Sequence, residues 1–229
     1  MAIFSGPKDY ATTRLILEGL RKEYSGKIYV ISPDGNFGGE GIINISDEEI
    51  LTQRALSLPN WYKQQLLKLL FLSHSKERKV FLIDGDTSLT KGVPLLEGKP
   101  VKLVSWESLV PYRSFLNLFD ANASAYSTIT HMAYYDLATE LRIKANLPIG
   151  INSVEELLFY CFENNIRFSE YLLIGMFSEG QEMYFYNKDV FNLEEFKRLK
   201  RSDSLSISLQ QWKRNSTGLR KLYHKIISI

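Results

Sequence analysis

The stretch "KVFLIDGDTSLTKG", from Lys79 to Gly92, runs from a strand-like segment into two aspartates separated by one glycine. Val80 to Asp84 is almost continuously apolar, which is typical of a parallel strand buried on both faces. Asp84 and Asp86 close this segment, and alternate residues of a strand point in roughly the same direction. Two like charges so close together repel each other and are costly to desolvate, so another group must compensate them.

A divalent cation is one way to compensate the two aspartates. Mg²⁺ and Mn²⁺ prefer oxygen ligands, and Mg²⁺ is usually held by one or two carboxylates together with substrate phosphates. In this interpretation Asp84 and Asp86 are half of a metal site that awaits a diphosphate. In the alternative interpretation the loop is structural, and Asp86 caps the backbone amides of Thr87 and Ser88. The aspartate pattern by itself leaves both interpretations open.

The residues before this stretch predict alternating strands and helices. Such an order indicates an α/β fold with a Rossmann-like half, in which ligands bind beyond the carboxyl ends of the strands. A Ser46/Glu49 capping box predicts a short helix. The other predicted elements are strands at Ala2–Ser5, Lys27–Ser32 and Gly41–Ser46 and helices at Tyr10–Tyr24 and from Asn60.

The second half contains further strand-like and helical segments. We expect one domain over residues 1–229: a nucleotide-binding half (1–100), a half for the acceptor and donor sugar (101–190) and a helical tail (191–229). The expected elements are strands at Lys99–Trp106, Ala125–Tyr135 and Glu182–Asn187 and helices at Asp136–Lys144, Val154–Asn164, from Ser169, and at Leu209–Ile229.

Composition excludes several classes of protein. A net charge of +2 is too small to indicate a nucleic-acid partner. Cys161 is the single cysteine, so no intrachain disulfide can form. The first ten residues are too polar for a secretory signal, and no apolar run approaches the roughly 20 residues that span a bilayer. We therefore expect a cytoplasmic protein without a membrane span.

Two enzyme chemistries use paired aspartates at the end of a strand. A glycosyltransferase uses a metal there to neutralise a leaving diphosphate. A phosphatase of the haloacid-dehalogenase type uses the first aspartate as nucleophile and the second as acid and base. Its D-x-D-x-T pattern is partly matched by Asp84 to Ser88, but in that family the motif normally follows the first strand. Here more than 80 residues precede it, and the sequence offers no later acidic pair to complete the site.

Several blocks together resemble a family of small GT-A-like glycosyltransferases found in surface-polysaccharide gene clusters and in some large DNA viruses. The resemblance extends over roughly residues 1 to 190 and lies in the order and spacing of the blocks. Many relatives have Ser or Ala where Gly85 stands here. The matching blocks are "IYVISPDG" (Ile28–Gly35), "WYKQQLLKL" (Trp61–Leu69), "FLIDGDTSLTKGV" (Phe81–Val93), "STITHMAYYD" (Ser127–Asp136) and "RFSEYLLIG" (Arg167–Gly175).

The resemblance implies a GT-A-like α/β fold with a mixed central sheet flanked by helices. It also implies transfer of a hexose from a nucleotide diphosphate sugar, expected to be a UDP-sugar, to a glycan acceptor, with Mn²⁺ or Mg²⁺. In this interpretation Asp86 is the main metal ligand, and Asp84 binds the ribose or reaches the metal through water. Gly85, without a side chain, would let metal and diphosphate approach the backbone closely. A phosphatase and a non-catalytic nucleotide-sugar-binding module remain the alternatives.

Five further residues are candidates for the nucleotide site. Ser5 and Gly6 follow the first strand and Asp34 follows the second, where a nucleotide is expected to lie. Lys63 and Gln64 lie on the helix that leads to the aspartate strand. Lys63 could neutralise diphosphate charge, or it could be an ordinary solvated lysine.

His131 and Glu170 are the candidate catalytic residues. His131 lies in an otherwise apolar and aromatic segment, either as a hydrogen-bonded core residue or as a ligand of metal, phosphate or sugar. Glu170 lies in the first turn of a predicted helix, where Ser169 can cap it. The resemblance implies that Glu170 deprotonates the acceptor hydroxyl in an inverting enzyme, or positions a sugar in a retaining one.

Overall fold

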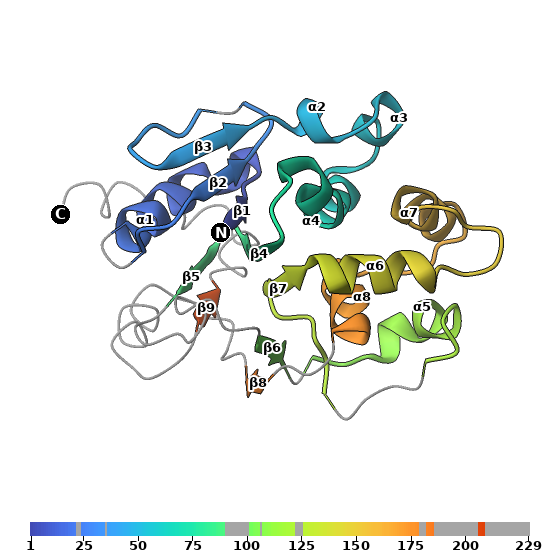
Figure 1. Cartoon of the computed structure of the whole chain (residues 1–229). Coiled ribbons are helices and arrows are strands. Elements are labelled where there is room, and N and C mark those ends of the chain that lie inside the picture. Colours follow the sequence, from blue (N-terminus) through green and yellow to red (C-terminus); the bar gives the residue numbers. More distant parts are fainter. Residues whose placement is uncertain are drawn as a thin grey trace, which may run out of the picture.

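Five short strands form the central sheet of the computed structural model, and helices cover both of its faces (Figure 1). The structure describes residues 1–21, 24–34, 36–89, 101–105, 107–121, 126–178, 182–185 and 206–208. The strands are β1 (Ala2–Phe4), β2 (Ile28–Ile31), β3 (Ile42–Ile45), β4 (Lys79–Asp84), β5 (Thr87–Leu89), β6 (Val101–Val104), β7 (Met132–Asp136), β8 (Glu182–Phe185) and β9 (Ser206–Ser208). The helices are α1 (Tyr10–Leu20), α2 (Asp47–Ile50), α3 (Gln53–Leu56), α4 (Asn60–Ser75), α5 (Arg113–Asn117), α6 (Leu137–Ala145), α7 (Val154–Glu163) and α8 (Glu170–Phe177), with 3₁₀ turns η1 (Pro7–Asp9) and η3 (Val110–Tyr112).

The central sheet is mixed, as the sequence predicts. Its order is β3-β2-β1-β4-β7, in which the first four strands are parallel and β7 runs antiparallel to β4. β1 and β2 are buried along their whole length, and β4 is buried from Val80 to Ile83. Continuous apolar runs of this kind are expected for strands that are covered on both faces.

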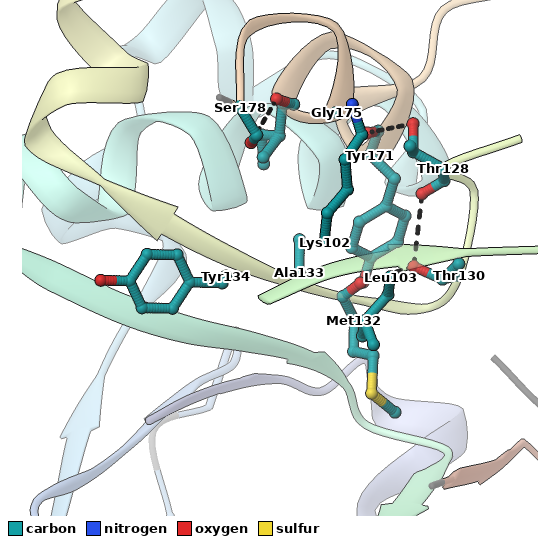
Figure 2. Close-up of a pocket in the computed structure, with 11 residues that line it drawn as sticks. Lys102, Leu103, Thr128, Thr130, Met132, Ala133, Tyr134, Tyr171, Gly175 and Ser178 are labelled. Atoms are coloured by element: carbon teal, nitrogen blue, oxygen red, sulfur yellow. Dashed lines mark hydrogen bonds between the residues drawn. The ribbon is translucent and has the colours of Figure 1, made fainter. Parts of the chain in front are cut away.

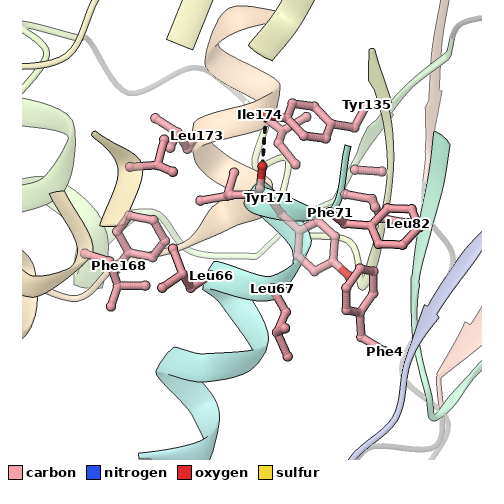
Figure 3. Packing of buried hydrophobic residues seen from close by; sticks show 14 of the residues in the cluster. Phe4, Leu66, Leu67, Phe71, Leu82, Tyr135, Phe168, Tyr171, Leu173 and Ile174 are labelled. Carbon is pink, nitrogen blue, oxygen red and sulfur yellow. Dashed lines mark hydrogen bonds between the residues drawn. The ribbon is translucent and has the colours of Figure 1, made fainter. Parts of the chain in front are cut away.

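Side chains of alternate strand residues enter two separate cores. Ile3 and Ile83 pack with Leu17 of α1 on one face of the sheet. Phe4 and Leu82 pack with residues of α4 and α8 on the other face (Figure 3). The period of two along each strand therefore decides which helix each residue meets.

Two parts of the second half differ from the sequence prediction. The strand expected over Ala125–Tyr135 is confined to β7, which begins only at Met132. His131 precedes that strand with a φ of 54°, a left-handed conformation that a continuous strand does not contain. In the segment 191–229, expected to be a helical tail, the described residues Ser206–Ser208 form the strand β9, and the expected helix Leu209–Ile229 lies entirely outside the described residues.

Two small sheets lie beside the central one. β6 pairs in parallel with β8, and β5 pairs antiparallel with β9. The pairing of β5 begins at Thr87, only one residue after Asp86. The turn that carries the two aspartates is therefore held on both sides by strand pairing.

The carboxyl ends of β1 and β4 meet at one edge of the sheet. Phe4 is in register with Asp84, and the amide of Gly85 donates a hydrogen bond to the Phe4 carbonyl over 2.8 Å. Thr13 of α1 donates to the Gly85 carbonyl over 2.9 Å and shares a 2.6 Å hydrogen bond with Ser5. These contacts hold the turn against β1 and α1.

The lack of a side chain at Gly85 is used for packing. A Cβ atom built there would lie 2.9 Å from the Phe4 carbonyl oxygen, the Ser5 Cα and the Thr13 hydroxyl. Two of these neighbours are backbone atoms, which cannot rotate away. Close packing between β1, β4 and α1 therefore requires a glycine at this position, while the close approach by metal and diphosphate stays a prediction.

We expect Gly85→Ala to lower the free energy of unfolding by about 1–3 kcal/mol, because the added methyl group displaces backbone. Gly19→Ala on α1 is the matched control, since no atom lies within 4 Å of its built Cβ. That change should leave stability unaltered or raise it by up to about 1 kcal/mol, because alanine favours a helix. Urea denaturation of both variants measures the difference. Equal effects at the two positions would contradict the packing role of Gly85.

Candidate functional site

Asp84 is the centre of a buried network of charged and polar side chains. The Lys68 ammonium contacts its Oδ1, and the Tyr171 hydroxyl donates to the same oxygen over 2.8 Å. Its Oδ2 lies 3.0 Å from Nδ1 of His131. Glu170 Oε1 is the second partner of Lys68, at 2.5 Å from Nζ. Residues from α4, β4 and α8 thus meet at the end of one strand.

The network sets the charge states of Asp84, Lys68 and Tyr171. Burial opposes ionisation of Asp84, but attraction to Lys68 and the hydrogen bond from His131 outweigh it and hold the pKa of that carboxyl well below its usual range. Burial likewise opposes the charge on Lys68, yet its two carboxylate partners raise its pKa above the ordinary value. Burial and the nearby carboxylates raise the pKa of Tyr171, which stays a neutral donor. Asp84 is therefore an ionised acceptor.

Lys68 and Tyr171 are the members of this network that sequence reasoning missed. The charge of Asp84 is compensated by this lysine within the protein, whereas the sequence interpretation left the compensation to a metal. One signal was available in the sequence: Lys68 is the charged residue within the otherwise apolar run Leu66–Leu72. A lysine in such a run needs an acidic partner, because lysine is almost never fully buried unless paired.

Asp86 is buried beside the network, with 4% of its surface exposed. The Thr87 hydroxyl lies 3.4 Å from its Oδ1, a long contact within the same turn. Asp84 and Asp86 thus differ in environment, since the first is bound to Lys68 of α4 and the second lies where the chain enters β5.

His131 is tied to Asp84 through both backbone and side chain. The Asp84 amide donates to the His131 carbonyl over 2.9 Å, and the ring nitrogen Nδ1 faces the Asp84 carboxylate. A carboxylate at one ring nitrogen is the usual way in which proteins orient an imidazole that binds a metal or phosphate through the other. The left-handed backbone of His131 is a further local constraint, of the kind that clusters at functional sites.

These residues could hold a divalent cation only together with ligands from a substrate. Within the described ranges, no three His, Cys, Asp or Glu side chains are arranged to hold a metal by themselves. Both oxygens of Asp84 are engaged by Lys68, Tyr171 and His131. Oxygens of Asp86 with those of a substrate diphosphate match the mixed ligand sets that Mg²⁺ commonly uses.

Glu170 is placed by the structure inside the network, with 3% of its surface exposed. It is the first residue of α8, and the Ser169 hydroxyl accepts a hydrogen bond from the Leu172 amide, so the predicted cap is confirmed. The Glu170 amide donates to Oε1 of Gln65 over 3.2 Å. A general base must reach the hydroxyl that it deprotonates. In this conformation Glu170 instead faces Lys68, so its catalytic role stays a prediction.

Four of the predicted nucleotide residues line one cleft, which we call the Lys63 cleft. It is small, with a volume of about 30 Å³ for the centres of water-sized probes. Asp34 lies outside its lining, where it accepts a 2.8 Å hydrogen bond from the Tyr10 hydroxyl. Asp47 lines the cleft and was not predicted. The complete lining is Phe4, Ser5, Gly6, Pro7, Ile31, Pro33, Asp47, Asn60, Lys63, Gln64 and Leu67.

A further cleft lies between β6, β7 and α8 (Figure 2). Thr128 donates to the Tyr171 carbonyl over 3.0 Å, which anchors α8 to the segment before β7. Lys102 of β6 also lines this cleft, and burial lowers its pKa.

None of the helices in the described residues combines the length and apolar character needed to cross a bilayer.

We expect Lys68→Met to lower the free energy of unfolding by about 3–5 kcal/mol, because it leaves two buried carboxylates without their cation. Lys76→Met, at the exposed end of α4, should change it by no more than about 0.5 kcal/mol. Adding Glu170→Gln to Lys68→Met should restore part of the loss.

The effect of Lys68→Met should also depend on pH. Since the folded-state pKa of Asp84 is depressed, its stabilising contribution is complete above the unfolded value of about 3.9 and is lost as the pH falls through the folded value. Denaturation curves at pH 7 and pH 3 should therefore show a smaller deficit in acid. A deficit independent of pH would contradict the ion-pair explanation.

Comparison with known proteins gives agreement in structure and none in sequence. No protein-family model matches the chain, and no curated protein matches it in sequence. The structure of the galactosyltransferase LgtC with donor and acceptor sugar analogues matches with a TM-score of 0.54 and 9% identity, over 98% of this chain and 95% of that one. An active-site mutant of LgtC matches with a TM-score of 0.56 and 12% identity, over 99% and 94%.

A third solved structure, the bifunctional glycosyltransferase WbbM, matches with a TM-score of 0.52 and 10% identity. The match covers 91% of this chain but 45% of WbbM. Identities this low establish the fold alone. Near-complete coverage of LgtC, together with the mixed sheet and its acidic turn, identifies the chain as a protein with the GT-A glycosyltransferase fold.

Proposed function

We propose that this protein is a glycosyltransferase that moves a hexose from a nucleotide diphosphate sugar, with UDP as the nucleotide, to a glycan acceptor. The observation that carries the proposal is the position of Asp84 and Asp86. They lie at the carboxyl edge of a GT-A sheet, and the adjoining end of β1 lines the Lys63 cleft. Ligands of open α/β sheets bind at this edge.

The residues of the site have distinct roles in this proposal. Lys63 and the backbone at Ser5 and Gly6 contact the nucleotide, and Lys63 offsets part of its diphosphate charge. Lys68 keeps Asp84 ionised and in place, so that Asp84 orients His131 toward the phosphate or sugar. Asp86, with substrate oxygens, would hold Mn²⁺ or Mg²⁺, which stabilises the negative charge that develops on the leaving diphosphate.

We propose that Glu170 is a positioning residue that acts through Lys68. Its carboxylate is buried in an ion pair, and it holds the cation that also holds Asp84. The alternative role, as the base that deprotonates the acceptor, requires Glu170 to leave Lys68 and reach the acceptor hydroxyl. The two roles predict different kinetics.

Asp86→Asn should abolish metal-dependent hydrolysis and transfer of the donor while the protein stays folded. We expect a loss larger than the roughly 10- to 100-fold that removal of an outer-shell partner costs, since Asp86 is proposed as a direct ligand. Asp120→Asn is the control, because Asp120 is exposed and asparagine tolerates its left-handed backbone. The assay is release of UDP from UDP-sugars with Mn²⁺ or with EDTA.

Unchanged turnover in Asp86→Asn would overturn the proposal. Two other results would redirect it. UDP binding at full strength in EDTA without turnover of any nucleotide sugar would indicate a non-catalytic binding module. Trapping of an acyl phosphate on Asp84 would indicate the phosphatase, although the pairing of Asp84 with Lys68 and Tyr171 opposes its use as a nucleophile.

Glu170→Gln should weaken donor binding and turnover together if Glu170 acts by positioning Lys68 and Asp84. Binding is measured by calorimetry with UDP, and turnover by UDP release at saturating donor. The pH profile of the remaining activity should keep the shape of the wild-type profile. A loss of turnover at unchanged UDP affinity, with the acidic limb of the pH profile removed, would establish Glu170 as the base instead.

A further inference from the structure

A larger pocket than the Lys63 cleft opens between α5, β6 and α8, and we call it the α5/α8 pocket. Its volume for the centres of water-sized probes is about 410 Å³. Sites that hold small molecules commonly measure about 300–1,000 Å³. Val104 of β6, Leu116 of α5 and Leu172 of α8 line the pocket and are buried. Because such a lining is mostly apolar, it favours a ligand with apolar surface.

Packing and hydrogen bonds hold the walls of the α5/α8 pocket in place. Phe119 and Phe177, which both line it, pack edge to face with 5.8 Å between their ring centroids. The Arg142 side chain donates a 2.7 Å hydrogen bond to the Phe177 carbonyl and so fixes the end of α8. Gly175 lets α8 approach Thr128, since a Cβ atom built on this glycine would collide with the threonine side chain. The pocket is therefore preformed, as is usual for sites of small ligands.

Lys102 is the one charged side chain among the described residues that line the α5/α8 pocket. Figure 2 shows it extending from β6 toward α8. Burial lowers its pKa, and no charged neighbour contributes to that shift. Within the described ranges it forms no hydrogen bond or ion pair. Since charges that leave water are normally paired, an anionic group of a ligand would supply the partner that the lysine lacks.

Lys102 also connects the α5/α8 pocket with the acidic network. It lines both this pocket and the cleft of Figure 2, which includes Tyr171, and the Tyr171 hydroxyl donates to Asp84. Glu170 of the network begins α8, whereas Met176 lines the pocket about 9 Å further along the helix axis. A ligand that extends from the network into the pocket therefore meets a polar site, then a cation and then an apolar space.

That order matches an acceptor in which a sugar is joined through a phosphate to an apolar chain. In an inference that rests on the proposed function, we propose that the α5/α8 pocket binds the chain of such a lipid-linked acceptor. Lys102 compensates the phosphate, and the sugar extends toward Tyr171 and Asp84. A phosphate suits this position better than a neutral linker, because hydrogen bonds between ionised groups are the stronger ones. Each methylene group that enters the pocket adds to the affinity.

Calorimetry with octyl phosphate, kept below its critical micelle concentration, tests the pocket directly. Wild-type protein should bind octyl phosphate at least about tenfold more tightly than the neutral 1-octanol, because a charge-assisted hydrogen bond is at stake. Lys102→Met should remove that difference and leave the affinity for 1-octanol within about threefold of the wild-type value. Lys76→Met, at the exposed end of α4, is the matched control and should bind both compounds as the wild type does.

Ala121→Phe tests the position of the apolar chain. Ala121 lines the pocket, and a phenylalanine there fills part of its volume. The affinities for octyl phosphate and for 1-octanol should therefore both fall at least about tenfold. Thermal denaturation should show a folded protein, since Ala121 is only half-buried. In the wild type, saturating octyl phosphate should leave the affinity for UDP unchanged, because the two ligands occupy different sites.

Transfer assays test whether the pocket serves the acceptor. Hexoses linked to octyl phosphate should be used with a KM at least about tenfold lower than that of the same free hexoses. Lys102→Met should raise the KM for the linked hexoses with little change in kcat, because the lysine contacts the linker and not the reacting atoms. Equal KM values for linked and free hexoses would overturn the role of the pocket as part of the acceptor site.

The outcomes separate the two proposals. If neither UDP nor any other nucleoside diphosphate binds, the proposed function fails. If UDP binds, but octyl phosphate does not or binds equally well to wild type, Lys102→Met and Ala121→Phe, the function stands and the assignment of the pocket is overturned. Displacement of UDP by octyl phosphate would place the compound in the nucleotide site. Dissociation of a dimer by octyl phosphate would assign the pocket to a second copy of the chain, and either result would likewise overturn the proposal.

Discussion

The ammonium group of Lys68 lies between the carboxylates of Asp84 and Glu170, with 4% of its side chain exposed. Ion pairs exposed to water contribute little to the stability of a protein. A buried ion has lost its hydration, so it depends on its charged partners for compensation. The three residues come from α4, β4 and α8, so the relative position of these elements is restricted by a charge requirement as well as by apolar packing. Tyr171 adds a hydroxyl donor to Asp84, and its ring lies 4.4 Å from the Lys68 nitrogen.

The same network links the structural core to the site. Asp84 ends a buried strand, and its carboxylate is oriented from inside by Lys68 while its other oxygen faces His131. Two hydrogen bonds hold the turn that follows. The Gly85 amide donates to the Phe4 carbonyl of β1, and the Thr13 hydroxyl of α1 donates to the Gly85 carbonyl. Asp86 is thus presented at the sheet edge by a backbone with little freedom. Such preorganisation limits the reorganisation needed when a charged substrate binds.

Helix α4 connects the two halves of the proposed nucleotide site. Its first turns provide Asn60, Lys63 and Gln64 to the cleft, and the next turn provides Lys68 to the acidic network. The apolar face of the same helix packs on β1 and β4, through residues such as Leu66 and Phe71 (Figure 3). A single amphipathic segment therefore sets the distance between the cleft and Asp84.

Local sequence patterns were sufficient to predict many of the strands and helices. Apolar runs predicted β1, β2 and β4, helical periodicity predicted α4 from Asn60, and Ser169 with Glu170 predicted the start of α8. These features depend on interactions between residues close in the chain. The strand expected over Ala125–Tyr135 was too long, since β7 begins only at Met132. Polar groups before Met132 form long-range contacts instead, such as the hydrogen bond from the Thr128 hydroxyl to the Tyr171 carbonyl. Strand periodicity does not encode such contacts.

By itself the sequence determined that the fold is α/β, that Asp84 and Asp86 follow a buried strand, and that no disulfide links parts of the chain. The tertiary structure decided which groups surround those aspartates. Lys68 reaches Asp84 across 16 residues and Glu170 across 102, and Asp47 reaches the Lys63 cleft from a different helix. Such pairings depend on long-range packing, and a buried charge acquires its partner only when distant elements meet.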